Sequence, residues 1–256
     1  MASVKSAERA LAILGLLTRQ ERPLTFREIE DALRYPRSSL HGLLRTLVTN
    51  GWIELDESSR AFRLGIRAWE AGHAYLRATT LADQALPYMR RVRDLLDETV
   101  QLAVLDGRHN VYVAKVDGTQ RLVLASEVGR RLEAHATGLG KALLAGLEPA
   151  EVERRLAGVA LERFTPHTLT DLAALKEELR RTRQRGYALD NEEYTRGVQC
   201  IAVPVRDHTG KVVAAMSVSV PKVRFDVARR RRALPILLDA AGALSRALGY
   251  ARNAER

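Results

Sequence analysis

The chain has 256 residues, of which 46% are apolar and 28% charged, and its formal net charge is +10. This composition excludes a disordered chain, leaves room for two modest domains and favours a polyanionic partner. Because the sequence has no run of 18 apolar residues, no signal peptide and a single cysteine, it excludes membrane spans and internal disulfides, and we expect a cytoplasmic protein.

Two helices are predicted near the N-terminus. Apolar residues at helical spacing predict the first helix at residues 6–19. Its expected buried face carries Ala10, Leu11, Leu14 and Leu17. Thr25 followed by Glu28 is a capping-box pattern, which predicts a second helix at residues 26–34. Only Tyr35 separates this helix from the next, as in a helix-turn-helix.

A third helix is predicted at residues 36–51, between a proline that can begin a helix and a glycine that can end one. Its apolar residues have the spacing of one helix face: Leu40, Leu43, Leu44, Leu47 and Val48. The opposite face is small, hydroxylated and cationic, and no Asp or Glu occurs at residues 32–53. Such a face suits the major groove of DNA, although an ordinary surface helix can share the pattern. The residues predicted to contact DNA are Arg37, Ser38, Ser39, His41, Gly42 and Arg45.

Two alternating segments, residues 52–55 and 61–64, predict a β-hairpin that would form a wing. Arg60 and Arg63 on this hairpin could contact phosphates or enter the minor groove. The alternative is a solvated hairpin tip, which two neighbouring acidic residues favour. We therefore predict a winged helix-turn-helix DNA-binding domain at residues 1–65.

A helical linker is predicted at residues 66–78, because the helical pattern continues and no Pro- or Ser-rich tether follows. Trp69 and Tyr75 are its expected apolar anchors. A stiff joint of this kind would transmit rotation between two domains.

The remaining residues, 79–256, have an α+β pattern. Helices are predicted at residues 81–96, 139–147, 151–156, 172–185 and 227–248, and strands at residues 100–105, 111–116, 121–126, 200–205 and 212–220. The buried face of the last helix is expected to carry Leu234, Leu237, Leu238, Ala241 and Leu244. Turn signals between successive strands favour an antiparallel sheet flanked by helices.

Two polar patterns in this part predict a ligand site. Thr137 can cap a helix whose first free N–H groups belong to Gly138 and Leu139, and a helix N-terminus is a ready anion site. The alternative is a helix start packed on the sheet. Ser217 and Ser219 share one face of a strand, so they form either a polar pocket floor or part of an exposed sheet face.

Asp190 and Cys200 are further candidates. Asp190 could bind a hydroxyl or amine of a ligand or cap the following turn, and beside a carboxylate ligand it would need a polar intermediary or a protonated state. Cys200 is typical of a buried small residue, but with His135 or His208 as base it could also be the nucleophile of an enzyme. No catalytic signature surrounds it and the histidines lack metal-ligand spacing, so we predict no enzyme activity, metal or cofactor.

Four stretches in order give the chain a resemblance to the IclR family of bacterial transcriptional regulators over essentially its whole length. They are residues 6–14 (SAERALAIL), 36–47 (PRSSLHGLLRTL), 135–145 (HATGLGKALLA) and 197–205 (GVQCIAVPV). The resemblance implies a winged helix-turn-helix, a helical linker and a GAF-like effector domain that forms dimers and often tetramers. It also implies that Asp190, Cys200, Ser217 and Ser219 line a ligand pocket. The chain departs from the family at Gly42, where members often carry a large basic residue, so operator preference does not carry over.

These patterns predict a transcriptional regulator with three partners: double-stranded DNA, a small-molecule effector and further copies of itself. The operator is expected to be roughly palindromic, because a homodimer or homotetramer would present paired winged helices. The resemblance implies a small organic acid or aromatic metabolite as effector, and we expect an organic or aromatic carboxylate from a catabolic pathway. Its carboxylate would sit on the N–H groups of Gly138 and Leu139 and would change the affinity for the operator.

Overall fold

The computed structural model describes residues 4–20, 22–78, 80–119 and 127–250, without the side chains of residues 75–80. The chain forms two compact units, Met1–Thr80 and Leu81–Arg256.

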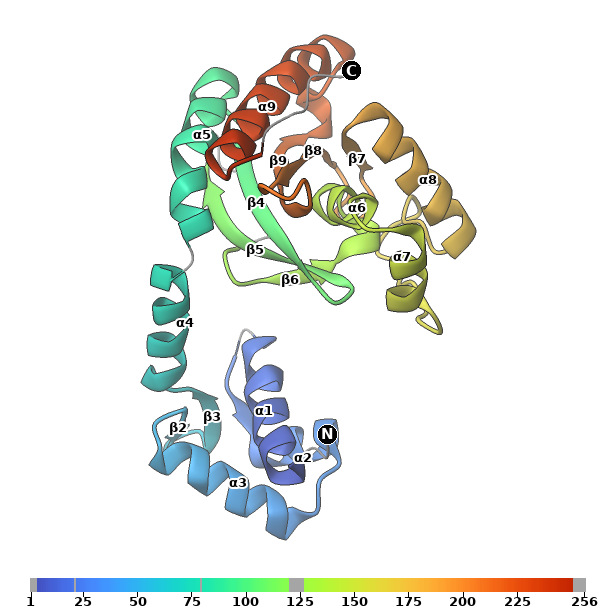
Figure 1. The fold of residues 1–256 in the computed structure, drawn as a ribbon. Helices are drawn as coiled ribbons and strands as arrows, with labels where there is room; N and C mark the ends of the chain where they lie inside the picture. Colours follow the sequence, from blue (N-terminus) through green and yellow to red (C-terminus); the bar gives the residue numbers. More distant parts are fainter. Residues whose placement is uncertain (1–3, 21, 79, 120–126, 251–256) are drawn as a thin grey trace. The chain divides into compact units, whose positions relative to one another are not determined.

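The first unit is a winged helix-turn-helix, as predicted (Figure 1). Its elements are α1 (Lys5–Thr18), β1 (Leu24–Thr25), α2 (Phe26–Leu33), α3 (Arg37–Thr49), β2 (Ile53–Asp56), β3 (Ala61–Leu64) and α4 (Ile66–Ala78). The capping box is confirmed, because the Thr25 hydroxyl accepts from the Glu28 N–H and the Glu28 carboxylate accepts from the Thr25 N–H. The short strand β1, which the sequence pattern did not predict, pairs with β3 and completes a three-stranded antiparallel sheet in the order β1-β3-β2.

The core of this unit lies between α1 and α3. Leu40, Leu44 and Leu47 of α3 are buried, as predicted from the helical stripe. On α1 the buried residues are Ile13, Leu16 and Leu17, so the predicted face is partly wrong: Leu11 is 68% exposed. Helix α1 has apolar residues on most of its sides. Their spacing in the sequence therefore fits either of two buried faces, the predicted one and the observed one, and both include Leu17.

The predicted anchoring role of Trp69 on α4 is also wrong within this chain. Its side chain is 63% exposed, and its indole ring stacks on the imidazole ring of His73 one turn later on the same helix, with 4.9 Å between ring centroids. Tyr75, the second predicted anchor, is among the residues whose side chains the structure does not describe.

The second unit is α+β, as predicted, and is built on a six-stranded antiparallel sheet in the order β6-β5-β4-β9-β8-β7. The strands are β4 (Thr99–Asp106), β5 (His109–Val116), β6 (Arg131–Glu133), β7 (Ala188–Asn191), β8 (Val198–Arg206) and β9 (Val212–Pro221). The helices are α5 (Thr80–Leu96), η1 (Ala134–Ala136), α6 (Gly138–Ala145), α7 (Pro149–Leu156), α8 (Leu172–Arg185), η2 (Lys222–Arg224) and α9 (Val227–Ala247). The strand predicted at residues 121–126 lies outside the described residues.

The two faces of this sheet are covered by different helices. Helices α5 and α9 cover one face, and α6, α7 and α8 gather on the other (Figure 1). Met216 and Val218 of β9 point into the core under α5 and α9, together with Leu237 and Leu244 of α9. Leu238, which was predicted on this buried face, is 41% exposed. Because side chains alternate along a strand, Ser217 and Ser219 point to the α6 side of the sheet.

Candidate functional site

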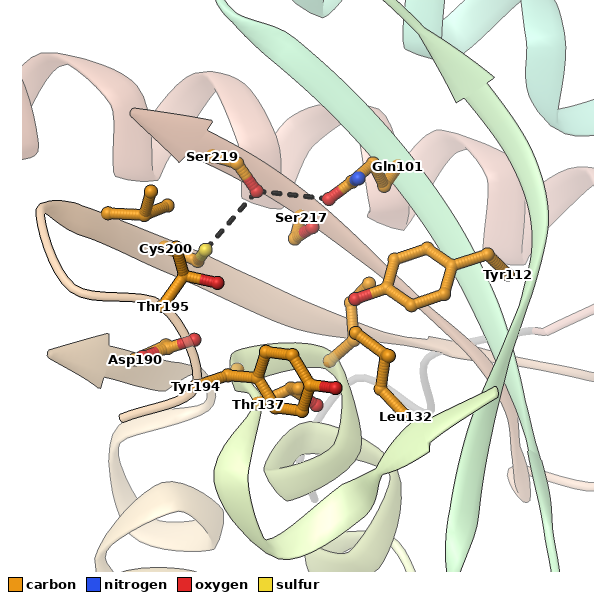
Figure 2. Close-up of a pocket in the computed structure, with 13 residues that line it drawn as sticks. Gln101, Tyr112, Leu132, Thr137, Asp190, Tyr194, Thr195, Cys200, Ser217 and Ser219 are labelled. Carbon is orange, nitrogen blue, oxygen red and sulfur yellow. Dashed lines mark hydrogen bonds between the residues drawn. The ribbon is translucent and has the colours of Figure 1, made fainter. Parts of the chain in front are cut away.

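A cavity lies on the α6 side of the sheet, between the first turn of α6, strands β4, β5, β8 and β9, and the segment after β7 (Figure 2). It is lined by Gln101, Tyr112, Leu132, Thr137, Gly138, Leu139, Asp190, Tyr194, Thr195, Val198, Cys200, Ser217 and Ser219. About 400 Å³ between these residues is free of protein atoms, and part of that space is open solvent. All six residues that the sequence suggested as effector-binding are brought together here.

The first turn of α6 is fixed by its cap. The Thr137 hydroxyl accepts from the Gly140 N–H at 3.0 Å and donates to the side-chain oxygen of Asn110 at 2.8 Å, which confirms Thr137 as the N-cap. Gly140 is required for a reason internal to the fold, because a Cβ there would lie 2.2 Å from Cα of Ala134. A Cβ on Gly138 would make only ordinary contacts. The first turn is thus held against the sheet while Gly138 and Leu139 face the cavity.

The two serines of β9 differ in how far their hydroxyls are engaged. The Ser219 hydroxyl donates to Oε1 of Gln101 at 3.0 Å, and Sγ of Cys200 lies 3.2 Å from the same hydroxyl oxygen (Figure 2). Since the Ser219 proton is used, the Cys200 S–H is the donor in the second contact. The Ser217 hydroxyl is also buried, yet it has no hydrogen-bond partner among the described residues. A buried hydroxyl without a partner is costly, so Ser217 is well placed to bind a ligand or a water molecule.

Asp190, at the end of β7, is 7% exposed and lies in the cavity wall. Its carboxylate accepts from the Glu193 N–H at 2.8 Å and so caps the turn after β7, and the Gly138 N–H at the start of α6 lies close enough to lower its pKa. Burial, together with the negative charge of Glu193, raises the pKa of Asp190 to about 7, although these two N–H groups and Lys141 oppose the shift. Asp190 can therefore change its charge near neutral pH.

Behind Asp190 lies an ion pair that the sequence analysis missed. Lys141 of α6 is 1% exposed and forms a salt bridge with Glu193, whose side chain is 8% exposed. The only signal was a lysine inside the otherwise apolar stretch GLGKALLA, and its carboxylate partner lies 52 residues away. The pair fixes the turn after β7 against α6, which positions Asp190.

Cys200 does not have the environment of a nucleophile. Burial, and then the charge of Asp190, raise the pKa of its thiol, so the thiolate is disfavoured. Of the two histidines considered as its base, His135 is bonded through Nε2 to the carbonyl oxygen of Glu162. His208 lies in the turn between β8 and β9.

The predicted DNA-contacting residues of α3 lie mostly on its exposed side. Ser38, Gly42 and Arg45 are exposed, and no heavy atom lies within 4 Å of a Cβ built on Gly42. His41 is exposed too, and its ring stacks on Phe26 with 4.2 Å between centroids.

The remaining predicted contacts are already engaged within the chain. The Arg37 guanidinium lies over the Phe26 ring, 5.5 Å from its centroid, and the Ser39 hydroxyl accepts from Arg9 at 3.0 Å. Arg60 pairs with Glu57 and Arg63 with Glu54 on the surface of the wing. Such exposed pairs contribute little stability, so phosphates can compete with these carboxylates for the arginines.

Both parts of the chain match known protein families. Residues 6–57 match the IclR helix-turn-helix domain, and residues 73–246 match the family described as bacterial transcriptional regulator IclR C-terminal. The chain belongs to the IclR family. It is therefore a transcriptional regulator with an N-terminal helix-turn-helix and a C-terminal effector-binding domain.

Relatives and solved structures agree along the whole chain. The HTH-type transcriptional regulator XynR of Escherichia coli (strain K12) is 39% identical over 250 residues, which cover 98% of this chain and 99% of that protein. The regulator BhcR of Paracoccus denitrificans (strain Pd 1222) is 38% identical, with 94% and 86% covered. An IclR homologue from Microbacterium hydrocarbonoxydans, solved in complex with 4-hydroxybenzoate, is 29% identical with a TM-score of 0.79, and 95% and 99% of the two chains are covered. Within the described residues of the present structure, no helix has the length and apolar character needed to cross a membrane.

Proposed function

We propose that this IclR-family regulator binds a small carboxylate effector in the α6-side cavity and that binding changes its affinity for operator DNA. Residues 1–65 would bind DNA, residues 66–78 would link the domains, and residues 79–256 would bind the effector and form the oligomer. The observation that carries this proposal is a cavity that combines the first turn of α6 with the unpartnered hydroxyl of Ser217.

The groups around the first turn of α6 favour a ligand with an anionic group. Gly138 and Leu139 contribute N–H groups at the N-terminus of α6, where the helix dipole favours negative charge. The Ser217 hydroxyl can donate to the same group. Tyr112 and Leu132 form an apolar part of the wall. The IclR homologue from Microbacterium hydrocarbonoxydans was solved with 4-hydroxybenzoate, which is a carboxylate, and this supports the proposed class of effector.

The DNA-binding half of the proposal rests on α3. Arg45 is exposed on the acid-free side of this helix, and none of the described carboxylates forms an ion pair with it. A bidentate contact between arginine and guanine contributes about 1–3 kcal/mol of discrimination. A phosphate contact would instead act on all sequences alike and would appear in the salt dependence of binding.

A binding assay with Ser217→Ala tests the effector half. The effector would be found by screening small carboxylates, 4-hydroxybenzoate included, for a rise in melting temperature, and operator binding would be measured by fluorescence anisotropy. An allosteric coupling of about 1–3 kcal/mol corresponds to roughly a 5- to 150-fold change in DNA affinity. Because Ser217 has no partner to lose, Ser217→Ala should fold normally and bind operator without effector as the wild type does, yet respond more weakly to the effector.

Ser219→Ala is a comparison variant in the same cavity. Unlike Ser217→Ala, it deprives Gln101 of a hydrogen-bond donor, so it should lower the stability of the ligand-free protein. A full effector response in Ser217→Ala would show that the carboxylate binds elsewhere.

The DNA half is tested by Arg45→Ala, with Arg67→Ala as a control on α4 at an exposed arginine that pairs with Glu70. Arg45→Ala should weaken operator binding, and the control should not. An Arg45→Ala protein with unchanged affinity and unchanged salt dependence would mean that another face of the unit binds DNA.

A further inference from the structure

The N-terminus of α6 already carries a carboxylate, which belongs to the chain itself. Asp190 accepts a hydrogen bond from the Glu193 N–H and lies beside Gly138, whose N–H lowers the pKa of its carboxyl group, and it is part of the wall of the cavity that the effector would occupy. Gly140 N–H is bonded to the Thr137 hydroxyl. In the described part of the chain, no hydrogen-bond acceptor is assigned to the Leu139 N–H, and Leu139 also lines the cavity.

No cationic side chain near Asp190 is free to offset a second negative charge beside it. Glu193, on the same turn, is paired with Lys141 of α6, so the nearest cation is already neutralised. Burial raises the pKa values of Tyr112 on β5 and Cys200 on β8, so both side chains are neutral. No Lys, Arg or His is among the described residues that line the cavity. A carboxylate effector would therefore meet the negative charge of Asp190 without a cation between them.

Two ionised carboxylates at one buried site repel each other strongly, and such pairs usually share a proton. We propose that Asp190 is the residue that selects the charge of the effector, and that a carboxylate effector binds only as Asp190 takes up one proton from solvent. This inference rests on the proposed function and deepens it. The proton would be carried by the Asp190 oxygen that does not accept from Glu193, and that O–H would donate to the effector carboxylate, whose other contacts are the Leu139 N–H and the Ser217 hydroxyl.

The arrangement makes effector binding depend on pH in one direction. Asp190 has a raised pKa of about 7, so the form that accepts a carboxylate is abundant at pH 6 and scarce at pH 8. By linkage, the affinity for a carboxylate should fall roughly tenfold between pH 6 and pH 8. A neutral carboxamide of the same shape needs no proton, so its affinity should stay nearly constant.

The decisive experiment measures the dissociation constants of matched pairs, 4-hydroxybenzoate with 4-hydroxybenzamide and lactate with lactamide, at pH 6 and pH 8 by calorimetry. Calorimetry at pH 8 in buffers of different ionisation enthalpy also counts the protons taken up, with a value close to one expected for the carboxylates. Asp190→Asn should bind the carboxylate with an affinity that no longer depends on pH. Asp171→Asn is the matched control, since Asp171 also caps a helix, α8, but lies outside the cavity, and this variant should keep the wild-type pH dependence.

A measurement without ligand separates this inference from the proposed function. In the wild type, the amide resonance of Gly138 should titrate with Asp190 near neutral pH, and in Asp190→Asn it should not. A Gly138 resonance that stays constant from pH 6 to pH 8, or wild-type carboxylate binding without proton uptake, overturns the inference. If Gly138 titrates but no carboxylate binds to either the wild type or Asp190→Asn, the carboxylate class of effector is wrong, while the position of Asp190 at the start of α6 is supported.

Discussion

Lys141 and Glu193 form a buried ion pair that positions Asp190. A substitution of either residue is expected to destabilise the protein. Removing one member leaves the other charge buried without a partner, which typically costs about 3–5 kcal/mol. We expect Lys141→Met to lower the free energy of unfolding of the second unit by this amount. Replacing both residues, as Lys141→Met with Glu193→Leu, should recover much of the loss, since a buried pair can often be replaced by apolar side chains.

Urea unfolding followed by far-UV circular dichroism measures both variants. The control is Lys176→Ala, which removes an exposed partner of Glu153 and should change stability by about 1 kcal/mol or less. A loss in Lys141→Met no greater than in this control would contradict the assigned burial of the pair.

At the residue scale, the sequence could predict which side chains share a face but not which of them meet. The alternation of β9 placed Ser217 and Ser219 together, and the cap at Thr137 placed Gly138 at a helix start. The contact between Asp190 and Gly138 depends on how β7 lies beside β8 and α6, which local periodicity does not contain. The partner of Lys141 was hidden for the same reason.

Helix α3 contains a glycine at a position where the fold does not require one. A Cβ on Gly42 would meet nothing within 4 Å, so the substitution Gly42→Ala removes the helix penalty of glycine without a clash. This should stabilise the first unit by about 1 kcal/mol. Both tryptophans, Trp52 and Trp69, lie in the first unit, so tryptophan fluorescence during urea unfolding reports on it. If Gly42→Ala leaves the free energy of unfolding unchanged or lowers it, then the fold of the first unit does favour glycine at this position.

The cap of α2 makes the stability of the first unit depend on pH. A hydrogen bond from Arg22, and then those from Thr25, lower the pKa of Glu28 to about 2, below its unfolded value of about 4.5. A lowered folded pKa stabilises the protein above the unfolded pKa, and this contribution is lost as the pH falls from about 5 to about 2. The stability of Glu28→Gln should therefore decline less steeply over this range than that of the wild type, as tryptophan fluorescence would measure. Parallel declines in the two proteins would contradict the assigned hydrogen bonds.

Element boundaries and faces differed in how well they could be predicted. Helix α2 has an explicit start signal, and its N-terminus was predicted at the residue where the structure begins it. Helix α1 has apolar residues on several sides, so its buried face could not be chosen without knowing that α3 packs against Ile13 and Leu16. Strand β1 is two residues long, too short to produce a periodic signal.

The chain as a whole exposes large apolar side chains in its first unit that its own fold does not cover. Leu11 of α1 is 68% exposed and Trp69 of α4 is 63% exposed. Single exposed apolar side chains are common on protein surfaces, whereas a contiguous apolar patch marks a contact. We extend the proposed function to a dimer in which Leu11 and Trp69 pack against a second copy, because two paired winged helices would read a roughly palindromic operator.

Leu11→Ser combined with Trp69→Ser tests this pairing. If these side chains pack against a second copy, their replacement removes buried apolar area from the interface, at about 25 cal/mol per Å², and weakens self-association. Sedimentation velocity at micromolar concentration should then show a smaller species than for the wild type, and operator affinity should fall because two half-sites are no longer bound together. Val223→Ser is the matched control, because Val223 is 94% exposed but lies in the second unit, and it should leave the pairing of the first units intact. If the double variant sediments and binds operator as the wild type does, these exposed residues do not form the contact between copies.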